Sequence, residues 1–462
     1  MSGEKQVQII MVSAAFQGHL NPKLNFAKRL VLKGARVTLI STDEARDGLI
    51  KSNALTRLNS DPNIQLEFFS DGLSLDFDRS KDAKSFMGTL ETEGAKNLSN
   101  LITLLSRDRK YSCMIVTAFL PWASEIAVAH SIPCAMLFFQ ASALYSIYYS
   151  FANKMFSPNF ENPDETVEIP GLPEFQVRDL PTFILPSCPR YHSKLVWDTF
   201  RFLVNMKWVL GVSVYEFEED IVNSMASLAP ILPIGPVVSP FLLGEKESDD
   251  LKVDLWNAED SCLEWLDKKL PSSVIYVAFG SLLVLSQKEM DNIAMALKNS
   301  NRAFLWVIRP TKNGGQLPSG FLEETEGRGQ VVSWCPQEKV LAHPAVACFV
   351  SHCGWNSTLE ELVAGVPVIG RPNWSDQPTN AKLVADIFKN GVKMRLEEDG
   401  IVSREEVERC ITEVMEGPKA DYMKKRALEL KATAKKALAD GGSSDRNINQ
   451  FLSEIVQQFT ST

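Results

Sequence analysis

The sequence lacks the marks of several classes of protein. Its 462 residues include eight cysteines, but these form no CxxC pair and no regular framework, as is typical of free thiols in a reducing compartment. No apolar run reaches the ~18 residues that a membrane span requires, and the first residues have neither the basic segment nor the cleavage site of a secretory signal. Basic residues number 48 against 57 acidic ones, which disfavours a nucleic-acid binder. We therefore expect a cytoplasmic protein without a membrane span.

The motifs of two cofactor sites are also missing. Three cysteines and two histidines between residues 335 and 353 have spacings that fit no zinc site. A dehydrogenase needs a GxGxxG motif after its first strand, whereas residues 7–20 contain a single glycine, Gly18. We therefore expect no bound metal. A dehydrogenase is an alternative function, and the single glycine of this turn argues against it.

The first half of the chain alternates apolar runs with helical patterns. Short apolar runs, typical of strands buried in a parallel sheet, occupy residues 7–13, 36–41, 64–69, 113–117, 134–139 and 209–214. The spacing of apolar residues predicts helices over residues 21–33, 83–105, 121–130 and from 141 onward. Pro22 suits the first turn of its helix. The Pro-rich residues 157–190 are predicted to form a loop with short elements that shapes a ligand pocket.

The second half repeats this alternation. It predicts strands over residues 273–279, 303–308, 331–333, 347–351 and 366–370, and helices over 287–298, 418–439 and 443–459. The Lys-rich helix 418–439 is interpreted as packed by one face rather than bound to a membrane. Residues 236–253, which contain Pro, Gly and a cluster of charged residues, are the best candidate for a linker between two domains. The fold class is α/β, with two doubly wound domains that face each other across a ligand-binding cleft.

Residues 334–377 carry the predicted chemistry. A strand that ends at Ser351 precedes a helix that begins near residue 355, and such a junction binds anions through backbone amides. His352, Asn356 and Ser357 add donors there, so a diphosphate can be held without a metal ion. Ser281, which follows the strand 273–279, can reach the same phosphates.

Other side chains of this segment suit the rest of a nucleotide sugar. Trp334 offers a stacking surface for a base. Glu360 follows Asn356 by about one helical turn and can accept hydrogen bonds from a ribose diol. Asp376 and Gln377 end a loop and suit sugar hydroxyls. Taken singly, Trp334 and Trp355 are better explained as core aromatics, and Asp376-Gln377 as an ordinary helix start. Only the joint pattern favours a site.

This segment resembles the donor-binding box of the plant family-1 UDP-dependent glycosyltransferases. The box begins at Trp334-Cys-Pro-Gln-Glu-Lys and continues through Phe349-Val-Ser-His-Cys-Gly-Trp-Asn-Ser357 to Asp376-Gln377. The resemblance extends to residues 18–22, 119–122 and 279–281, and so over nearly the whole chain. Arg178-Asp-Leu-Pro181 and Thr117 are most similar to the branch with anthocyanin 5-O-glucosyltransferases and enzymes that form glucose esters of plant acids.

The resemblance implies a GT-B fold and a metal-independent, inverting transfer from UDP-glucose to a small molecule by a monomer. It divides the chain into an acceptor domain (1–240), a linker (241–254), a UDP-sugar domain (255–440) and a final helix (441–462) that packs back on the first domain. Trp334 would stack on uracil, Gln337 and Glu360 would meet the ribose, and Trp355 would join Asp376 and Gln377 at the hexose. The residues that it places at the donor are Gly18, Ser281, Trp334, Cys335, Gln337, His352, Trp355, Asn356, Ser357, Glu360, Asp376 and Gln377.

By the same resemblance, His19 is the general base that deprotonates the acceptor. The family commonly places an Asp at the end of the strand 113–117, where this chain has Thr117. A hydroxyl can fix the imidazole tautomer but cannot stabilise imidazolium with a full charge. We therefore expect an acceptor that ionises readily, either a flavonoid-like phenol or a carboxylic acid such as a hormone or an apocarotenoid, and a β-glucoside or glucose ester as product.

The acceptor pocket is expected in the first half of the chain. Its candidates are aromatic residues near strand ends, namely Phe16, Phe119, Trp122, Phe139 and Tyr145. Core packing is the alternative for each of them. A catalytically silent UDP-sugar binder is a second rival, which Thr117 supports and the retention of His19 opposes.

Overall fold

The computed structural model describes residues 6–13, 17–51, 55, 58, 61–79, 81–245, 261–280, 283–309 and 314–461, with the backbone alone for 17–19 and 459–461. Phe16 and Ser281, predicted for the acceptor and donor sites, lie outside the described residues. So do residues 246–260, which include most of the linker 241–254 that the resemblance implies.

The first domain is built on a parallel sheet. Among the described residues its strands follow the order β3-β2-β1-β4-β5-β8-β9. Their bounds are β1 (Gln8–Val12), β2 (Arg36–Thr42), β3 (Ile64–Phe69), β4 (Cys113–Thr117), β5 (Cys134–Phe138), β8 (Trp208–Gly211) and β9 (Leu232–Pro233). The predicted apolar runs correspond to all of these strands except β9, a two-residue edge strand whose proline suits a sheet edge.

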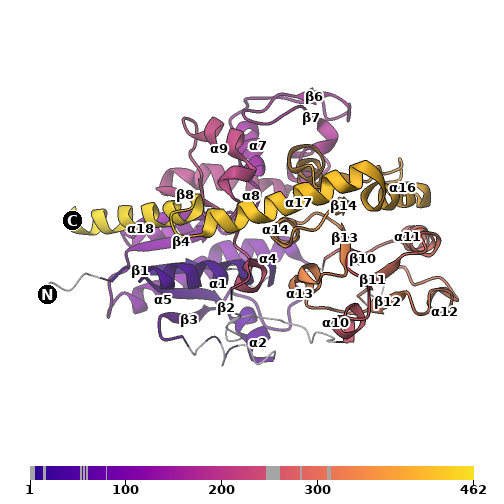
Figure 1. The fold of residues 1–462 in the computed structure, drawn as a ribbon. Coiled ribbons are helices and arrows are strands. Elements are labelled where there is room, and N and C mark those ends of the chain that lie inside the picture. Colours follow the sequence, from indigo (N-terminus) through magenta and orange to yellow (C-terminus); the bar gives the residue numbers. More distant parts are fainter. Residues whose placement is uncertain are drawn as a thin grey trace.

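The second domain is built on another parallel sheet, in the order β12-β11-β10-β13-β14-β15 within the described part of the chain. Its strands are β10 (Val274–Ala278), β11 (Ala303–Val307), β12 (Gly329–Val332), β13 (Val346–Ser351), β14 (Val368–Gly370) and β15 (Gly391–Lys393). The two sheets confirm the predicted pair of α/β domains. Figure 1 shows them side by side.

Helices cover the sheets. Those of the first domain are α1 (Gln17–Leu32), α2 (Asp43–Lys51), α4 (Ala83–Thr89), α5 (Ala95–Leu105), α6 (Ala123–Ala129), α7 (Ser142–Ala152), α8 (Arg190–Arg201) and α9 (Glu219–Met225). Those that follow are α10 (Ser261–Leu266), α11 (Gln287–Asn299), α12 (Phe321–Glu324), α13 (Gln337–Ala342), α14 (Trp355–Ala364), α15 (Gln377–Lys382), α16 (Arg404–Met415), α17 (Gly417–Leu438) and α18 (Ser443–Ser461). Side chains cap some of them, as where Ser286 Oγ accepts a hydrogen bond from Glu289 N at the start of α11.

Several details differ from the sequence prediction. Helix α1 begins at Gln17 rather than at residue 21, so Pro22 lies inside it. The predicted helix 83–105 is divided by a π-helical turn, η1 (Leu90–Gly94), into α4 and α5. The Pro-rich segment contains a short hairpin of β6 (Thr166–Val167) and β7 (Phe175–Gln176), followed by the 3₁₀ turns η2 (Val177–Asp179) and η3 (Thr182–Ile184). Helix α8, which follows this segment, was not predicted.

Part of the predicted linker is packed rather than extended. Residues of the 3₁₀ turn η6 (Pro240–Leu243) contact α13 and α14 of the second domain. Leu242 and Leu243 are buried there. The chain therefore already contacts the second domain before residue 246.

The last two helices join the domains. Helix α17 packs against α14 of the second domain, and α18 packs against β9 of the first. Figure 1 shows the two helices, in yellow, following one another across the molecule. Trp208 Nε1 donates to Glu454 Oε2 at 2.6 Å, and the rings of Trp208 and Phe451 meet edge to face at 5.3 Å. Lys33, just after α1, forms an ion pair with Asp445 at 2.6 Å.

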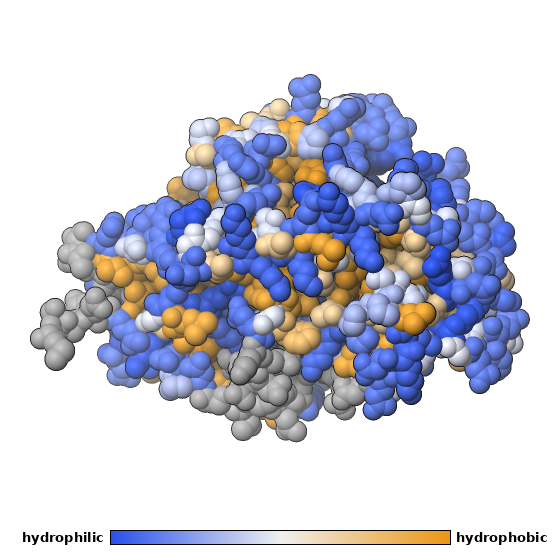
Figure 2. All heavy atoms as spheres, viewed as in Figure 1, coloured by the Kyte–Doolittle hydropathy of each residue, from blue (hydrophilic) through white to orange (hydrophobic). Residues whose placement is uncertain are grey.

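The surface is mainly hydrophilic on the face shown in Figure 2, with apolar residues in separate groups. Within the described ranges, none of the helices combines the length and the apolar character that a membrane span needs.

Candidate functional site

The junction between β13 and α14 has the geometry of an anion-binding site. β13 ends at Ser351, and Gly354 precedes α14 without a side-chain cap. Ser351 Oγ accepts a hydrogen bond from Cys353 N at 3.1 Å, while Cys353 adopts φ 61°. This local arrangement turns the chain sharply from strand to helix. A helix N-terminus of this kind attracts anions through its backbone amides and its dipole.

His352 lies in this turn between two glycines. A Cβ atom added to Gly280 or to Gly354 would lie 2.7 Å from His352 Nε2, so the ring packs directly against both backbones. Burial lowers the pKa of His352 to about 4, and the imidazole is therefore neutral at physiological pH. Its Nδ1 is buried and has no hydrogen-bond partner in the described part of the chain. A neutral imidazole with an unpartnered nitrogen can donate to a phosphate oxygen.

A connected polar network lies beside the start of α14. Gln337 Nε2 donates to Glu360 Oε2 at 2.7 Å and to Ser357 Oγ at 2.9 Å. The amide oxygen of Gln337 accepts a hydrogen bond from Tyr276 Oη at 3.1 Å, and Tyr276 Oη lies 3.3 Å from Cys335 Sγ. The structure thus brings together four residues that the sequence assigned to the donor, and Tyr276 joins them from β10. The Glu360 carboxylate, fixed by this network, is suited to a diol.

Trp334 follows β12 at the edge of the same region. The guanidinium carbon of Arg309 lies 4.4 Å from the centre of its ring. Trp334 Nε1 is buried and unpartnered among the described residues. Arg309 was not predicted, although cation–π packing orients the indole that is expected to stack on a base.

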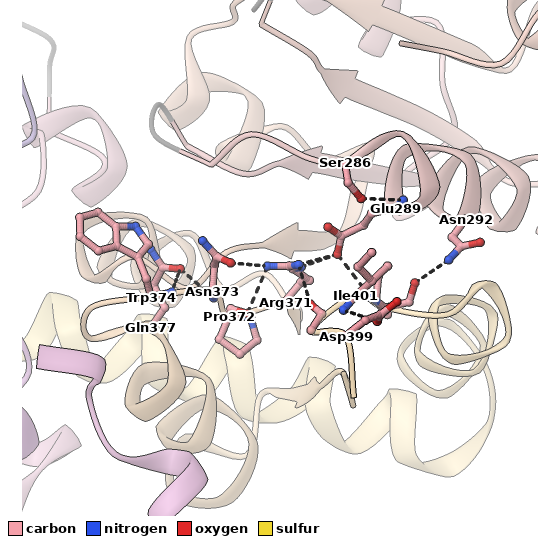
Figure 3. A network of polar contacts seen from close by, with 12 residues as sticks. Ser286, Glu289, Asn292, Arg371, Pro372, Asn373, Trp374, Gln377, Asp399 and Ile401 are labelled. Atoms are coloured by element: carbon pink, nitrogen blue, oxygen red, sulfur yellow. Dashed lines mark hydrogen bonds and ion pairs between the residues drawn. The ribbon is translucent and has the colours of Figure 1, made fainter. Parts of the chain in front are cut away.

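The loop that follows β14 ends at Asp376 and Gln377 and is held from both domains. Figure 3 shows its anchor in the second domain. Arg371 and Glu289, each 3% exposed, form an ion pair at 2.6 Å. Arg371 Nη1 also donates to Asn373 Oδ1 at 3.1 Å, and Gln377 Oε1 accepts from Asn373 N at 2.9 Å. The loop therefore depends on a buried ion pair with α11.

The side chain of Asp376 is buried. It is 8% exposed and accepts a hydrogen bond from Asn380 Nδ2 at 2.8 Å. Burial raises the pKa of Asp376, while hydrogen bonds from Asn380 and from the backbone of Trp355 act in the opposite direction. The Trp355 indole itself is 3% exposed and packs against Phe388, with ring centres 6.4 Å apart. Among the described contacts, Trp355 thus meets the predicted sugar loop through its backbone.

Residues of the Arg178-Asp-Leu-Pro181 motif hold this loop from the first domain. Asp179, 3% exposed, lies 2.6 Å from Lys393 Nζ and 3.8 Å from Lys382 Nζ. Its backbone oxygen accepts a hydrogen bond from Thr379 Oγ1 at 2.7 Å. Nearby, Trp374 contacts Phe183, with ring centres 5.8 Å apart. A motif that served to identify a branch in the sequence therefore lies between the domains.

The predicted acceptor side is formed by the carboxyl ends of the first sheet. Gly18 and His19 lie in the first turn of α1, which follows β1, and the side chain of His19 is outside the described atoms. Thr117 ends β4 and is 1% exposed, and none of the described side chains or backbone groups bonds its Oγ1. Lys23 of α1 is also buried here, and the sequence did not single it out.

The aromatic candidates divide between core and edge. Trp122 (6% exposed) and Tyr145 (fully buried) belong to apolar cores, as the alternative reading held. Phe119 and Phe139 are partly buried. Tyr145 contacts Phe138 edge to face at 5.3 Å. In the described ranges, no three His, Cys, Asp or Glu side chains are grouped so that they could hold a metal ion.

Most contacts that sequence reasoning missed join residues that are distant in the chain. Arg371 and Glu289 are 82 residues apart, and Asp179 and Lys393 are 214 apart. Local spacing carries no signal for such pairs. Lys23 had a local signal, because it is a lysine among the apolar positions of an otherwise amphipathic helix.

Comparison with known proteins gives one consistent result. Residues 262–434 match the family model UDPGT, UDP-glucoronosyl and UDP-glucosyl transferase. The chain is 46% identical to UDP-glycosyltransferase 84B2 of Arabidopsis thaliana, over 96% of this chain and 99% of that protein. It is 38% identical to gallate 1-beta-glucosyltransferase of Quercus robur, over 98% and 91%.

A solved structure supports the same assignment. Os79 from O. sativa, crystallised in complex with UDP, superposes with a TM-score of 0.85 at 32% identity, over 97% of this chain and 100% of that one. The fold is therefore GT-B, as expected from the resemblance. The resemblance to anthocyanin enzymes in particular stays a prediction. From these similarities and the geometry above, the chain belongs to the family of UDP-glucosyl transferases and is a UDP-glycosyltransferase that takes a UDP-sugar as donor.

Proposed function

We propose that this enzyme transfers glucose from UDP-glucose to the carboxyl group of a small plant acid and forms a glucose ester. The observation that carries the proposal is Thr117, a buried residue without a charge at the end of β4, where the family commonly has an Asp. A base that lacks a carboxylate partner is a weak base for an alcohol. A carboxylic acid has already lost its proton at neutral pH. The gallate enzyme of Quercus robur, by its name, acts on such an acid.

In this proposal the second domain holds UDP-glucose. The neutral His352, Ser357 and the first turn of α14 bind the diphosphate, Trp334 stacks on uracil, and Glu360, oriented by Gln337, binds the ribose. Asp376 and Gln377 bind hexose hydroxyls from a loop that both domains hold. His352 Nδ1 and Trp334 Nε1 have no partner among the described residues, which supports the fit of a ligand with many acceptor oxygens.

The transfer itself is a single displacement. The acceptor oxygen attacks the anomeric carbon from the side opposite UDP, a bond to that oxygen forms, and the bond to the phosphate oxygen breaks as UDP leaves with the electron pair. The product is the β-anomer. His19, in the first turn of α1, is the general base when the acceptor is a phenol, and for an ionised acid it has no proton to remove.

The test is an acceptor pair that separates the two attacked atoms. 3,4,5-Trimethoxybenzoic acid offers only a carboxyl group, whereas methyl gallate offers only phenols. With UDP-glucose, we expect the acid to give a product one hexose heavier that hydroxylamine cleaves, as it cleaves esters. UDP-galactose serves as the donor control. Glucosylation of methyl gallate alone, with a product from which hydroxylamine releases no glucose, would contradict ester formation.

A further inference from the structure

Lys23 is a buried cation close to the proposed site of transfer. It is 1% exposed, in the second turn of α1, and lies four residues after His19. Long side chains of a helix run back toward its N-terminus, so the ammonium group of Lys23 reaches the carboxyl ends of the strands. Its Nζ donates to Ser13 Oγ at 2.8 Å and lies 5.1 Å from the centre of the Phe139 ring.

The sheet register places this ammonium group at the end of β4. Strand β4 lies between β1 and β5. Ile115 pairs with Met11 on one side, and Thr117 pairs with Leu137 on the other. Extending this register by two residues puts Ser13 level with Thr117. Because Lys23 contacts the residues that follow β1 and β5, its charge lies over the intervening strand end, where Thr117 stands.

The charge of Lys23 has no carboxylate partner in the described part of the chain. Ser13 Oγ is its hydrogen-bond acceptor there, and burial lowers the pKa of Lys23. A buried ammonium group is costly without an anion. The neighbouring Thr117 Oγ1 is equally buried and makes no hydrogen bond to any described residue. The Lys23 ammonium, which has no anion, and the Thr117 hydroxyl, which has no partner among the described residues, form a cradle for a carboxylate.

We propose that Lys23 and Thr117 bind the carboxylate of the acceptor, an inference that rests on the proposed ester-forming function. One carboxylate oxygen accepts hydrogen bonds from the ammonium and the hydroxyl. The other oxygen attacks the anomeric carbon with its own electron pair, and the glycosidic bond to UDP breaks. The acid enters ionised, so no proton has to be removed. The cation thereby selects acids over phenols.

The decisive variant is Lys23→Met, which keeps the length and apolar stem of the side chain and removes the charge. We expect kcat/KM for 3,4,5-trimethoxybenzoic acid to fall by roughly 10- to 100-fold, mainly through KM, because a charge-assisted hydrogen bond is lost. Turnover of methyl gallate and the Kd for UDP should stay within about 3-fold. Lys28→Met removes a partly exposed lysine from the same helix and serves as the matched control.

The outcomes separate the two proposals. Equal losses on the acid and the phenol, or no loss on either, would overturn the role of Lys23 while leaving ester formation intact. If the wild-type enzyme forms no ester, the proposed function is wrong. The Kd of the acid, compared between wild type and Lys23→Met, then tests whether Lys23 binds the carboxylate. Weaker acid binding in the variant supports it, and equal binding refutes it. If Lys23→Met does not fold, Lys23→Gln supplies the same comparison, because it also removes the charge.

Discussion

Thr182 and Ser375 exchange two hydrogen bonds between the domains. Ser375 N donates to Thr182 Oγ1 at 2.7 Å, and Thr182 N donates to Ser375 O at 2.8 Å. Ser375 adopts φ 60°, a left-handed conformation that is unfavourable for residues other than glycine. It directly precedes Asp376 and Gln377. The first domain thus fixes the backbone of the loop that is proposed to bind the sugar of the donor.

We expect Thr182→Val to raise the KM for UDP-glucose by about 5- to 10-fold, since it leaves Ser375 N without its acceptor at a cost of ~1 kcal/mol. The Kd for UDP should change less than 2-fold, because UDP lacks the hexose. Initial rates and titration calorimetry measure the two quantities. Thr182→Ser keeps the hydroxyl and should behave as wild type. A parallel rise in the Kd for UDP would refute a role limited to the sugar loop.

Gly280→Ala is expected to displace His352. The added Cβ would lie 2.7 Å from His352 Nε2, and Gly280 has φ +70°. We expect UDP affinity to fall at least 10-fold in calorimetric titration. Gly320→Ala is the matched control, because Gly320 also has a positive φ but nothing within 4 Å of the added atom. Both variants should lose about 1 kcal/mol of unfolding free energy from backbone strain. Equal loss of UDP affinity in both would contradict the steric argument.

The neutral state of His352 predicts how stability depends on pH. Its folded-state pKa of about 4 lies below the usual value of 6.5. The unfolded chain therefore binds a proton more readily between these values, and the folded protein loses stability as pH falls from about 6.5 to 4. A shift of this size corresponds to roughly 3 kcal/mol. His352→Gln should lack this contribution, so its unfolding free energy, measured with urea at several pH values, should gain on wild type as the solution becomes more acidic. Parallel pH profiles would argue against a neutral buried imidazole.

The titration of Glu361 should make the folded protein less stable as pH rises, opposite to the effect of His352. Its side chain is fully buried, and both carboxyl oxygens lack hydrogen-bond partners within the described residues. Burial raises the pKa of Glu361 well above the ordinary value, so the folded state holds a proton that the unfolded chain releases above about pH 4.3. Stability is therefore lost as pH rises through this range.

The gain in unfolding free energy of Glu361→Gln over wild type should consequently be larger at pH 7 than at pH 4, by about 1–3 kcal/mol. Its affinity for UDP should not change. Thermal unfolding across this pH range measures the difference. The adjacent Glu360→Gln is the matched control, because Glu360 accepts a hydrogen bond from Gln337 and is proposed to bind the ribose. That variant should weaken UDP binding instead. A stability gain of Glu361→Gln that is constant with pH would point to packing rather than titration.

Sequence reasoning succeeded where a local pattern has one structural solution. Strand β4 coincides with a continuous apolar run, because a strand buried on both faces requires it. The resemblance to the donor box assigned Gln337 and Glu360 to the ribose and Ser357 to the diphosphate, and hydrogen bonds join these three residues. The family followed from this segment alone.

Other features could not be derived because tertiary contacts decide them. Trp355 stands among donor residues in the sequence, yet its indole is buried, since the inner face of α14 packs against the core. Pro22 suggested a helix start, but α1 already begins at Gln17. The support of the sugar loop by Glu289 and Thr182 involves partners 82 and 193 residues away from the residues that they contact.

The return of α18 to the first domain has a mechanical consequence. The chain crosses from the first domain to the second after β9, and it crosses back between α17 and α18. The second crossing is short, because only residues 439–442 separate α17 from α18, so a large displacement of one domain would pull α18 with it. Sideways sliding of one sheet past the other would have to strip Trp208 from Glu454 and Lys33 from Asp445. We therefore expect substrate entry and product release to leave α18 in contact with the first domain.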